Sequence, residues 1–269
     1  MAGVVVVFDF DFTLIDYDSE NWVVDTFGLT DLFEQCLPTM SWNSLMDKIM
    51  KELYLKGLSI EDIEGCLRTI PLDSHVASVI KIAHALGCEL RIVSDANKLF
   101  IETILVQHGL LEYFSEINTN PCYVDEEGRL RISPYHDHIM AVHGCNLCPP
   151  NMCKGMILDR IRASAAIAGK KQLIYVGDGK GDYCPSLRLT EGDCLMPRKD
   201  FPLSKLLYAN SDLLKARPHH WSSSEELKEV LLRLITQLGA NSLSLVGCNH
   251  KEIQESPQEV LSLALRMHN

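Results

Sequence analysis

Two aspartates, Asp9 and Asp11, stand at the end of a short apolar run and are the first candidates for chemistry in this sequence. The run at residues 4–8 contains four valines and a phenylalanine, a composition typical of a strand buried on both faces. In an extended chain, side chains two residues apart point to the same side, so both carboxylates are expected to face one point. Taken alone, the aspartates could equally be solvated residues that open a loop.

A second acidic cluster follows another apolar run, at residues 172–176. Three glycines at alternate positions after this run are expected to let the backbone turn tightly. Asp178 and Asp182 are four residues apart, so both could face one point from a strand end and the first helical turn. Four converging carboxylates repel one another, and oxygen ligands without histidine or cysteine are typical of Mg²⁺. A glycine-rich loop with incidental acids is the alternative. The predicted Mg²⁺ ligands are Asp9, Asp11, Asp178 and Asp182.

An anionic substrate bound to Mg²⁺ also needs donors for its other oxygens. Ser94 ends an expected strand at residues 89–94 and supplies a hydroxyl group, beside the N-terminus of the helix that follows. Lys154 opens an expected helix just before the strand at 172–176 and supplies a positive charge. A lone helical lysine is more often a solvated surface residue, so the order of the elements carries this assignment.

The elements that would position these residues alternate between strands and helices. This alternation predicts an α/β fold with a mostly parallel, doubly wound, Rossmann-like sheet. A hairpin is expected to turn at residues 125–128, and an amphipathic helix at 225–238 closes the pattern. Strands are expected at residues 4–8, 89–94, 114–117, 172–176 and 194–196.

Residues 14–69 show helical patterns that no convincing strand interrupts. They predict a helical cap inserted directly after the first strand, a natural position for a lid over the site. We expect a core domain at 1–15 and 73–239, a small cap at 16–72, and a loosely ordered C-terminal tail at 240–269.

The composition of the 269-residue chain indicates a globular protein with a sizeable core, since 46% of its residues are hydrophobic. A formal net charge of −11 argues against a nucleic-acid surface. No continuous apolar stretch is long enough for a membrane helix, and no secretory signal is visible. Ten cysteines in such a chain indicate reduced thiols, so we expect a cytoplasmic protein.

The order of these motifs resembles that of the haloacid-dehalogenase-type phosphatases. The matching motifs are DFDFT at 9–13, Ser94, Lys154 and GDGKGD at 177–182. More narrowly, VSDAN at 93–97, CPPNMCKG at 148–155 and GDYCP at 181–185 resemble the phosphoethanolamine/phosphocholine phosphatase branch, especially its plant members. Plant relatives in that branch are also described as thiamine monophosphate phosphatases or pyrophosphatases.

The resemblance implies a role for each motif residue. Asp9 would be the nucleophile that forms an aspartyl-phosphate, and Asp11 would be the general acid and base. Asp9, the backbone carbonyl of Asp11 and Asp178 would hold Mg²⁺, with Asp182 as a further or water-mediated ligand. Lys154 and Ser94 would bind the phosphoryl oxygens of the substrate.

Two positions depart from the family pattern. Phe12 stands where relatives often carry a small or basic residue, which is expected to alter the mouth of the site. Glu20 stands where the branch usually shows an aspartate thought to help bind the amine of the substrate. With Asp95, Glu20 could still form an anionic pocket for a cationic head group. The alternative is that Glu20 is simply exposed to solvent, as most acidic residues on helices are.

A cysteine-rich segment before Lys154 is a separate candidate for metal binding. Its side chains include the ligand types of a structural Zn²⁺ site. The spacing is compressed for a two-knuckle zinc finger, and free cysteines are also common as small buried hydrophobes. The candidate zinc ligands are His143, Cys145, Cys148 and Cys153.

The sequence therefore predicts a Mg²⁺-dependent phosphatase of small phosphorylated metabolites, with no nucleic-acid or membrane partner. Phosphoethanolamine and phosphocholine are the preferred substrates, followed by thiamine monophosphate and then inorganic pyrophosphate, which has no cationic end. A receiver-like module that accepts phosphate on an aspartate as a signal is the alternative from another class. Receivers do not need the second aspartate at position 11, which counts against this alternative.

Overall fold

The computed structural model describes residues 3–136, 143–170 and 172–246. At its centre is a six-stranded sheet with the strand order β3-β2-β1-β6-β7-β8, in which every neighbouring pair is parallel. The strands are β1 (Val4–Phe8), β2 (Glu89–Asn97), β3 (Phe114–Asn120), β6 (Gln172–Gly177), β7 (Cys194–Pro197) and β8 (Arg217–Pro218).

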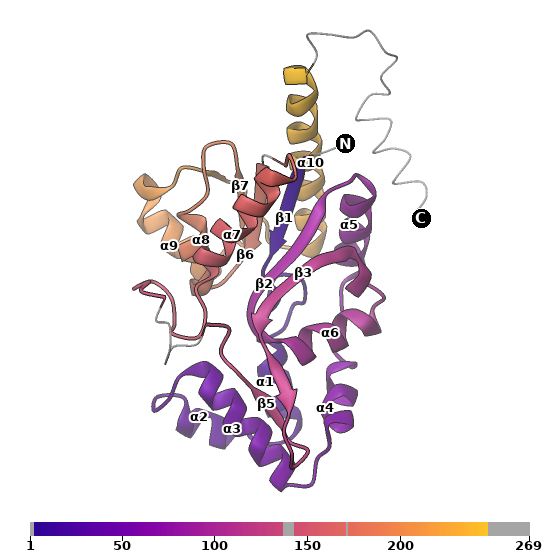
Figure 1. Ribbon diagram of the computed structural model, residues 1–269, viewed down its shortest axis with the longest axis vertical. Coiled ribbons are helices and arrows are strands. Elements are labelled where there is room, and N and C mark those ends of the chain that lie inside the picture. Colours follow the sequence, from indigo (N-terminus) through magenta and orange to yellow (C-terminus); the bar gives the residue numbers. More distant parts are fainter. Residues whose placement is uncertain (1–2, 137–142, 171, 247–269) are drawn as a thin grey trace.

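Helices cover both faces of this sheet, which confirms the predicted doubly wound α/β fold (Figure 1). The flanking helices are α5 (Ser74–Ala85), α6 (Lys98–Gln107), α7 (Lys154–Ile167), α8 (Tyr183–Ser186), α9 (Pro202–Ala209) and α10 (Ser224–Val246). Val4 and Val6 of β1 pack with α5, α6 and α10, whereas Val5 and Val7 pack with α7 and α9. Alternate side chains of a strand point to opposite faces, so a run of valines is buried on both.

Four helices between β1 and α5 lie together at one end of the sheet (Figure 1). They are α1 (Ser19–Thr26), α2 (Thr30–Cys36), α3 (Trp42–Leu55) and α4 (Ile60–Leu67).

The antiparallel hairpin of β4 (Cys122–Val124) and β5 (Leu130–Ile132) lies against α3. Arg131 of the hairpin forms a bidentate ion pair with Asp47 of α3, with nitrogen–oxygen distances of 2.8 and 2.7 Å. We propose that the cap comprises this hairpin as well as residues 16–72.

Several strands and helices differ from the sequence-based expectations, among them β3, which continues past residue 117 to Asn120. The two-residue strand β8 was not predicted, because it contains a proline and no apolar run. Strand β2 continues past Ser94 to Asn97, with an irregular register against β3. Helix α10 continues through Gly239 to Val246, since one glycine inside a helix costs only about 1 kcal/mol. The rest of the predicted loose tail lies outside the described residues.

Over the three described stretches, no helix combines the length and the apolar character needed to cross a membrane.

Candidate active site

The carboxyl ends of three neighbouring strands meet at the edge of the sheet that faces the cap. Because β1 lies between β2 and β6, the residues that follow these strands are brought together. A cavity of about 570 Å³ opens there between sheet and cap. It is lined by Asp9, Asp11, Phe12, Asp18, Glu20, Trp42, Ser94, Asp95, Ala96, Pro149, Asn151, Lys154, Asp178, Gly179, Lys180, Gly181 and Pro202.

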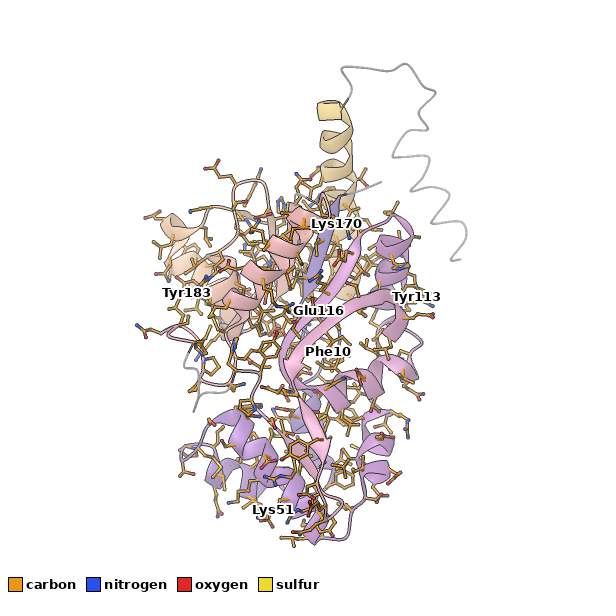
Figure 2. All side chains as sticks on the ribbon, in the orientation of Figure 1. Phe10, Lys51, Tyr113, Glu116, Lys170 and Tyr183 are labelled. Atoms are coloured by element: carbon orange, nitrogen blue, oxygen red, sulfur yellow. The ribbon has the colours of Figure 1, made fainter. Side chains whose placement is uncertain are left out.

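The turn after β1 alternates between the cavity and the core. Asp9 and Asp11 line the cavity, whereas Phe10 between them is fully buried among core side chains. Figure 2 labels Phe10 near the middle of the molecule. The backbone N–H of Phe10 donates a 2.7 Å hydrogen bond to Asp9 Oδ1. Burial of this phenylalanine therefore anchors the turn that presents both carboxylates.

Lys154 is the cation at the floor of the site. Its ammonium nitrogen lies 2.7 Å from Asp9 Oδ2 and 3.0 Å from Asp182 Oδ1. The lysine side chain is only 4% exposed, so it is a buried charge and not a solvated surface residue. Burial lowers its pKa, but Asp182 and Asp9 outweigh this effect and hold the pKa above its usual range. Lys154 is therefore positively charged at all ordinary pH values.

The carboxylate of Asp182 is fully occupied by donors from the protein. Its Oδ1 accepts from Lys154 Nζ at 3.0 Å and from the Tyr175 hydroxyl at 2.7 Å. Its Oδ2 accepts from the backbone N–H groups of Asp178 and Gly179 at 3.0 and 2.9 Å. Four hydrogen bonds to a carboxylate that does not line the cavity make Asp182 an anchor for the loop after β6.

This anchor explains one glycine of the GDGKGD motif. A Cβ atom on Gly177 would lie 2.5 Å from Asp182 Oδ2, which is too close for any real contact. The described glycines with a positive φ all lie outside this motif, so a left-handed backbone does not explain Gly177. Position 177 requires glycine because the Asp182 carboxylate occupies the space that a Cβ atom would need.

Two of the expected Mg²⁺ ligands, Asp9 and Asp178, keep carboxylate oxygens toward the cavity. Oxygens of Asp9, Asp178 and Asp182 lie within 4.8 Å of one another. Asp178 Oδ1 accepts a 3.0 Å hydrogen bond from the Thr13 hydroxyl. Burial and the nearby Asp182 raise the pKa of Asp178 to about 7. An all-oxygen cluster with this excess of negative charge fits a hard divalent cation such as Mg²⁺.

Asp11 is in a different environment from Asp9. It faces the cap, where its Oδ1 accepts a 3.0 Å hydrogen bond from the backbone N–H of Ser19. Burial and the charge of Asp18 raise the pKa of Asp11 to about 8, so the carboxyl group is mostly protonated at neutral pH. A carboxyl group that is protonated at neutral pH and faces the cavity is what general acid catalysis requires.

Ser94 and Asp95 lie where the sequence places them, in the cavity beside Lys154. Ser94 is 1% exposed, and its hydroxyl accepts a 3.2 Å hydrogen bond from the backbone N–H of Ala96. The hydroxyl proton of Ser94 is thus available to an anion in the cavity. Asp95 Oδ1 is buried and has no hydrogen-bond partner within the described part of the chain.

Glu20 is buried in the cap wall of the cavity, not solvated. Its two oxygens accept from the indole N–H of Trp42 and, at 3.3 Å, from Asn97 Nδ2. Burial and the neighbouring Asp18 raise the pKa of Glu20 well above its usual range. Asp18 caps α1 and lines the same wall. The wall thus combines two carboxyl groups with an indole ring.

Phe12 lines the cavity mouth and has a left-handed backbone, with φ of 52°. Its carbonyl oxygen accepts a 2.6 Å hydrogen bond from Arg198, and its ring packs against Phe201 with the ring centres 5.8 Å apart. The guanidinium of Arg198 also lies over the Phe201 ring, at 4.3 Å. These contacts hold the strained backbone of Phe12.

Sequence reasoning missed several residues of the cavity. Asp18 had a local signal, because an aspartate before a helix is a common N-cap. Lys180 lies inside the GDGKGD motif after β6, so its position at this sheet edge followed from the motif. Trp42 had no local signal, since no short-range pattern brings the start of α3 to the end of β1; it lines the cavity because α3 lies over the sheet edge.

Three of the four predicted zinc ligands lie close together. Cys145, Cys148 and Cys153 lie close to one another, but their fourth neighbour is Cys184 of α8 and not His143. Both ring nitrogens of His143 are used by backbone groups. Nδ1 accepts from the N–H of Cys145 at 3.1 Å, and Nε2 lies 2.9 Å from the carbonyl oxygen of Pro149.

The parallel α/β sheet, with two aspartates directly after its central strand, is the haloacid-dehalogenase-like fold that the sequence predicted. The chain matches the model of the family described as Putative Phosphatase over residues 4–235, and it belongs to that family.

Named relatives agree with this class. Inorganic pyrophosphatase 2 of Arabidopsis thaliana is 58% identical over 88% of this chain and 85% of its own. The Thiamine phosphate phosphatase-like protein of Arabidopsis thaliana is 51% identical over 88% of this chain and 98% of its own. Among solved structures, a phosphoserine phosphatase in apo form shares the fold, with a TM-score of 0.56 and 18% identity over 86% of this chain and 98% of its own.

Proposed function

We propose that this phosphatase is Mg²⁺-dependent and hydrolyses small phosphomonoesters that carry a cationic group, through an aspartyl-phosphate on Asp9. Phosphoethanolamine and phosphocholine are the preferred substrates. The observation that carries the proposal is the polarity of the cavity. Its floor holds a buried lysine 2.7 Å from Asp9, and its cap wall holds the carboxyl groups of Asp18 and Glu20 beside Trp42.

In the first step, a carboxylate oxygen of Asp9 attacks phosphorus, and the bond from phosphorus to the leaving oxygen breaks. Asp11 gives its proton to that oxygen, so the leaving group departs as an alcohol and not as an alkoxide. Lys154 and Ser94 donate to the phosphoryl oxygens. Mg²⁺, held by Asp9, Asp178 and the backbone carbonyl of Asp11, would neutralise phosphoryl charge when bound.

In the second step, Asp11 takes a proton from a water molecule, which attacks the phosphorus of the aspartyl-phosphate. The bond between phosphorus and the Asp9 oxygen breaks, and inorganic phosphate and the free carboxylate of Asp9 result. Asp182 acts as a positioning residue, since its oxygens hold Lys154 and the backbone at Asp178. Any role of Asp182 at the metal would then be indirect, through water or through Asp178.

The cap wall favours a substrate with a positive charge. Six carboxyl groups and two lysines line the cavity, and the phosphate site accounts for Lys154. A quaternary ammonium or amine group would be attracted by the carboxyl oxygens of Asp18 and Glu20, most strongly once these groups are ionised. Trp42 would add a cation–π contact of about 0.5–2 kcal/mol. Thiamine monophosphate, which is also cationic, is the next candidate substrate.

Inorganic pyrophosphatase activity is the second candidate function. Two observations favour it: the name of the Arabidopsis relative, and Lys180 at the rim, which could meet a second phosphate group. The acidic cap wall disfavours it, because a second anionic group would face Asp18 and Glu20.

The chemistry is tested with Asp9→Asn, which should abolish Mg²⁺-dependent phosphate release. Asp31→Asn, at an exposed position in α2, is the matched control and should leave turnover unchanged. Wild-type turnover by Asp9→Asn would contradict the mechanism. A stable aspartyl-phosphate with little turnover in the wild-type protein would instead indicate a receiver-like module.

The substrate is tested by comparing kcat/KM for phosphocholine, phosphoethanolamine, thiamine monophosphate and pyrophosphate on one enzyme preparation. We expect the two amino-alcohol phosphates to give the highest values. A higher value for pyrophosphate than for all three cationic esters would favour the second candidate function.

A further inference from the structure

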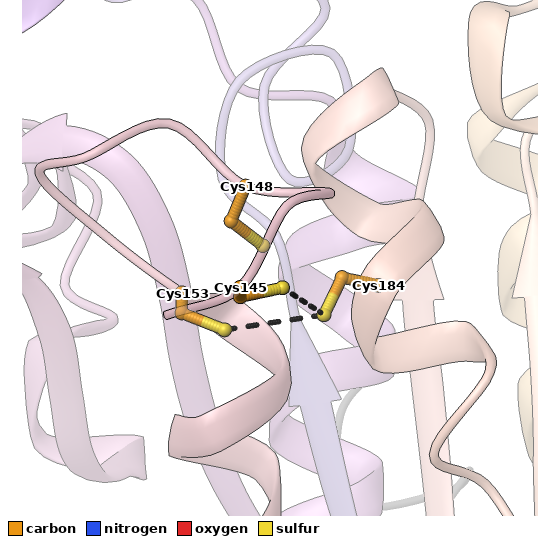
Figure 3. A group of neighbouring side chains, drawn as sticks. All are labelled: Cys145, Cys148, Cys153 and Cys184. Carbon is orange, nitrogen blue, oxygen red and sulfur yellow. Dashed lines mark hydrogen bonds between the residues drawn. The ribbon is translucent and has the colours of Figure 1, made fainter. Parts of the chain in front are cut away.

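Four cysteine thiols gather beside the candidate active site, from two separate segments of the chain. Cys145, Cys148 and Cys153 precede α7, whereas Cys184 belongs to α8. All four sulfur atoms lie within 4.8 Å of one another. In Figure 3 the side chains converge, and the sulfur of Cys184 lies 3.6 Å from that of Cys145 and 3.9 Å from that of Cys153. All four are free thiols.

We propose that these four cysteines form a structural Zn²⁺ site. In a tetrahedral site with zinc–sulfur bonds of about 2.3 Å, neighbouring sulfur atoms are about 3.8 Å apart. Two sulfur pairs, Cys145–Cys184 at 3.6 Å and Cys153–Cys184 at 3.9 Å, match this spacing. They are far longer than the ~2.05 Å of a disulfide bond. Four soft thiolate ligands in a closed tetrahedral arrangement are typical of structural zinc.

His143 is excluded as a ligand by its own hydrogen bonds. Its Nδ1 lone pair is directed to the N–H of Cys145, and its Nε2 lies at hydrogen-bond distance from the carbonyl oxygen of Pro149. The histidine therefore shapes the loop that carries Cys145. The fourth ligand is Cys184, which follows the GDGKGD motif in the sequence and is close to the other thiols only in the fold.

The surroundings of Cys184 provide both space and charge for such a site. A Cβ atom on Gly155 would lie 2.5 Å from the sulfur of Cys184 and 2.8 Å from Arg188 Nε, so only glycine leaves room there. Binding replaces the four thiol protons, which pass to solvent, and leaves a complex of net charge −2. The guanidinium of Arg188, which hydrogen-bonds the sulfur of Cys184, would offset part of this charge.

The bound ion would join the two segments that carry the floor of the phosphate site. Cys153 directly precedes Lys154, and Cys184 lies two residues after Asp182. Lys154 and Asp182 are themselves paired at 3.0 Å. Zinc would thus cross-link the chain on both sides of this ion pair without touching the substrate. Its role is structural and independent of the Mg²⁺-dependent chemistry.

The first test is the zinc content of the full-length protein, purified without a His-tag and without chelators. Elemental analysis should find about one zinc per chain. Replacement by Co²⁺ should give the intense visible absorption and the sulfur-to-metal charge-transfer band of tetrahedral thiolate cobalt. Both readouts use the wild-type protein, so they do not depend on a variant that folds, and neither measures phosphatase activity.

The second test identifies the ligands. Cys184→Ser should lower the affinity for zinc at least tenfold in competition with a chromogenic chelator, because one of four ligands is lost. His143→Ala and Cys122→Ser should retain zinc; Cys122 is a free thiol outside the cluster, with its sulfur 3.2 Å from the N–H of Leu99. Gly155→Ala should also weaken zinc binding, because the added methyl group displaces Cys184.

Several results would overturn the proposal. One is wild-type protein that contains less than a tenth of a zinc per chain and does not take up Co²⁺ with the tetrahedral spectrum. Another is a disulfide between cluster cysteines in freshly purified protein, seen as a mass loss of two hydrogens. An iron–sulfur chromophore would reject zinc as the ion, and zinc loss in His143→Ala but not in Cys184→Ser would reject the ligand set.

Discussion

Replacing Lys154 with methionine should damage both stability and catalysis, by amounts that the geometry allows us to estimate. The variant keeps most of the side-chain volume and removes the charge. It leaves Asp9 and Asp182, whose oxygens lie 2.7 and 3.0 Å from the ammonium group, without their common cation. Breaking a buried ion pair by removing one partner costs about 3–5 kcal/mol. For a chain of this length, that loss lowers the melting temperature by roughly 6–20 °C.

The same substitution removes a donor to the phosphoryl oxygens. Loss of one preorganised donor lowers kcat by about 10²–10³-fold. The assay is phosphate release at saturating substrate, paired with urea unfolding of the same preparation. Lys180→Met is the matched control, because Lys180 lines the same cavity but is exposed. We expect its stability to change by less than about 0.5 kcal/mol.

Two further measurements separate the charge effect from lost packing. In the double variant Lys154→Met/Asp182→Asn, the loss of stability should be smaller than the sum of the single losses by about 0.5–3 kcal/mol, because the second change removes a charge left unpaired by the first. Added Mg²⁺ should stabilise Lys154→Met more than wild type, since the unpaired carboxylates bind the cation more strongly. A Lys154→Met protein within 1 kcal/mol of wild type that retains more than a tenth of kcat would refute the reasoning.

Three other predictions concern the metal and the cap wall. Asp178→Asn should raise the Mg²⁺ concentration needed for half-maximal activity at least tenfold, because it removes a cavity-facing carboxylate; unchanged Mg²⁺ dependence would exclude Asp178 as a ligand. Trp42→Leu should raise KM for phosphocholine by roughly 2–30-fold through the lost cation–π contact, while KM for glycerol phosphate, which has no cation, stays the same. The raised pKa of Glu20 means that its carboxyl group ionises only at higher pH. The ratio of kcat/KM for phosphocholine to that for glycerol phosphate should therefore increase with pH, and this increase should vanish in Glu20→Gln.

The cap wall illustrates how far sequence reasoning reaches. Glu20 was expected in the head-group pocket from the family resemblance, and it lines the cavity. Its partners, Trp42 and Asn97, come from α3 and from the end of β2. No spacing in the sequence relates these three residues, because the orientation of the cap over the sheet brings them together.

Asp182 shows that a sequence motif does not reveal whether a carboxylate is free to bind a ligand. Its position in the GDGKGD motif predicts a carboxylate near the metal, and it does lie near Asp9 and Asp178. Whether an oxygen is free for a ligand depends on its hydrogen bonds, and four protein donors occupy Asp182. These hydrogen bonds can be recognised only in the folded structure, because Tyr175 and Lys154 reach Asp182 through the tertiary fold.

The sequence by itself determined the parallel α/β fold and the placement of Asp9 and Asp178 at one sheet edge. Both follow from local patterns: β-branched runs form buried strands, and the residues directly after such strands lie at the carboxyl edge. Only the tertiary structure decided that Cys184 joins the other three thiols and that Trp42 faces Glu20. These contacts join residues far apart in the chain, and their proximity depends on how helices pack on the sheet and not on any periodicity of the sequence.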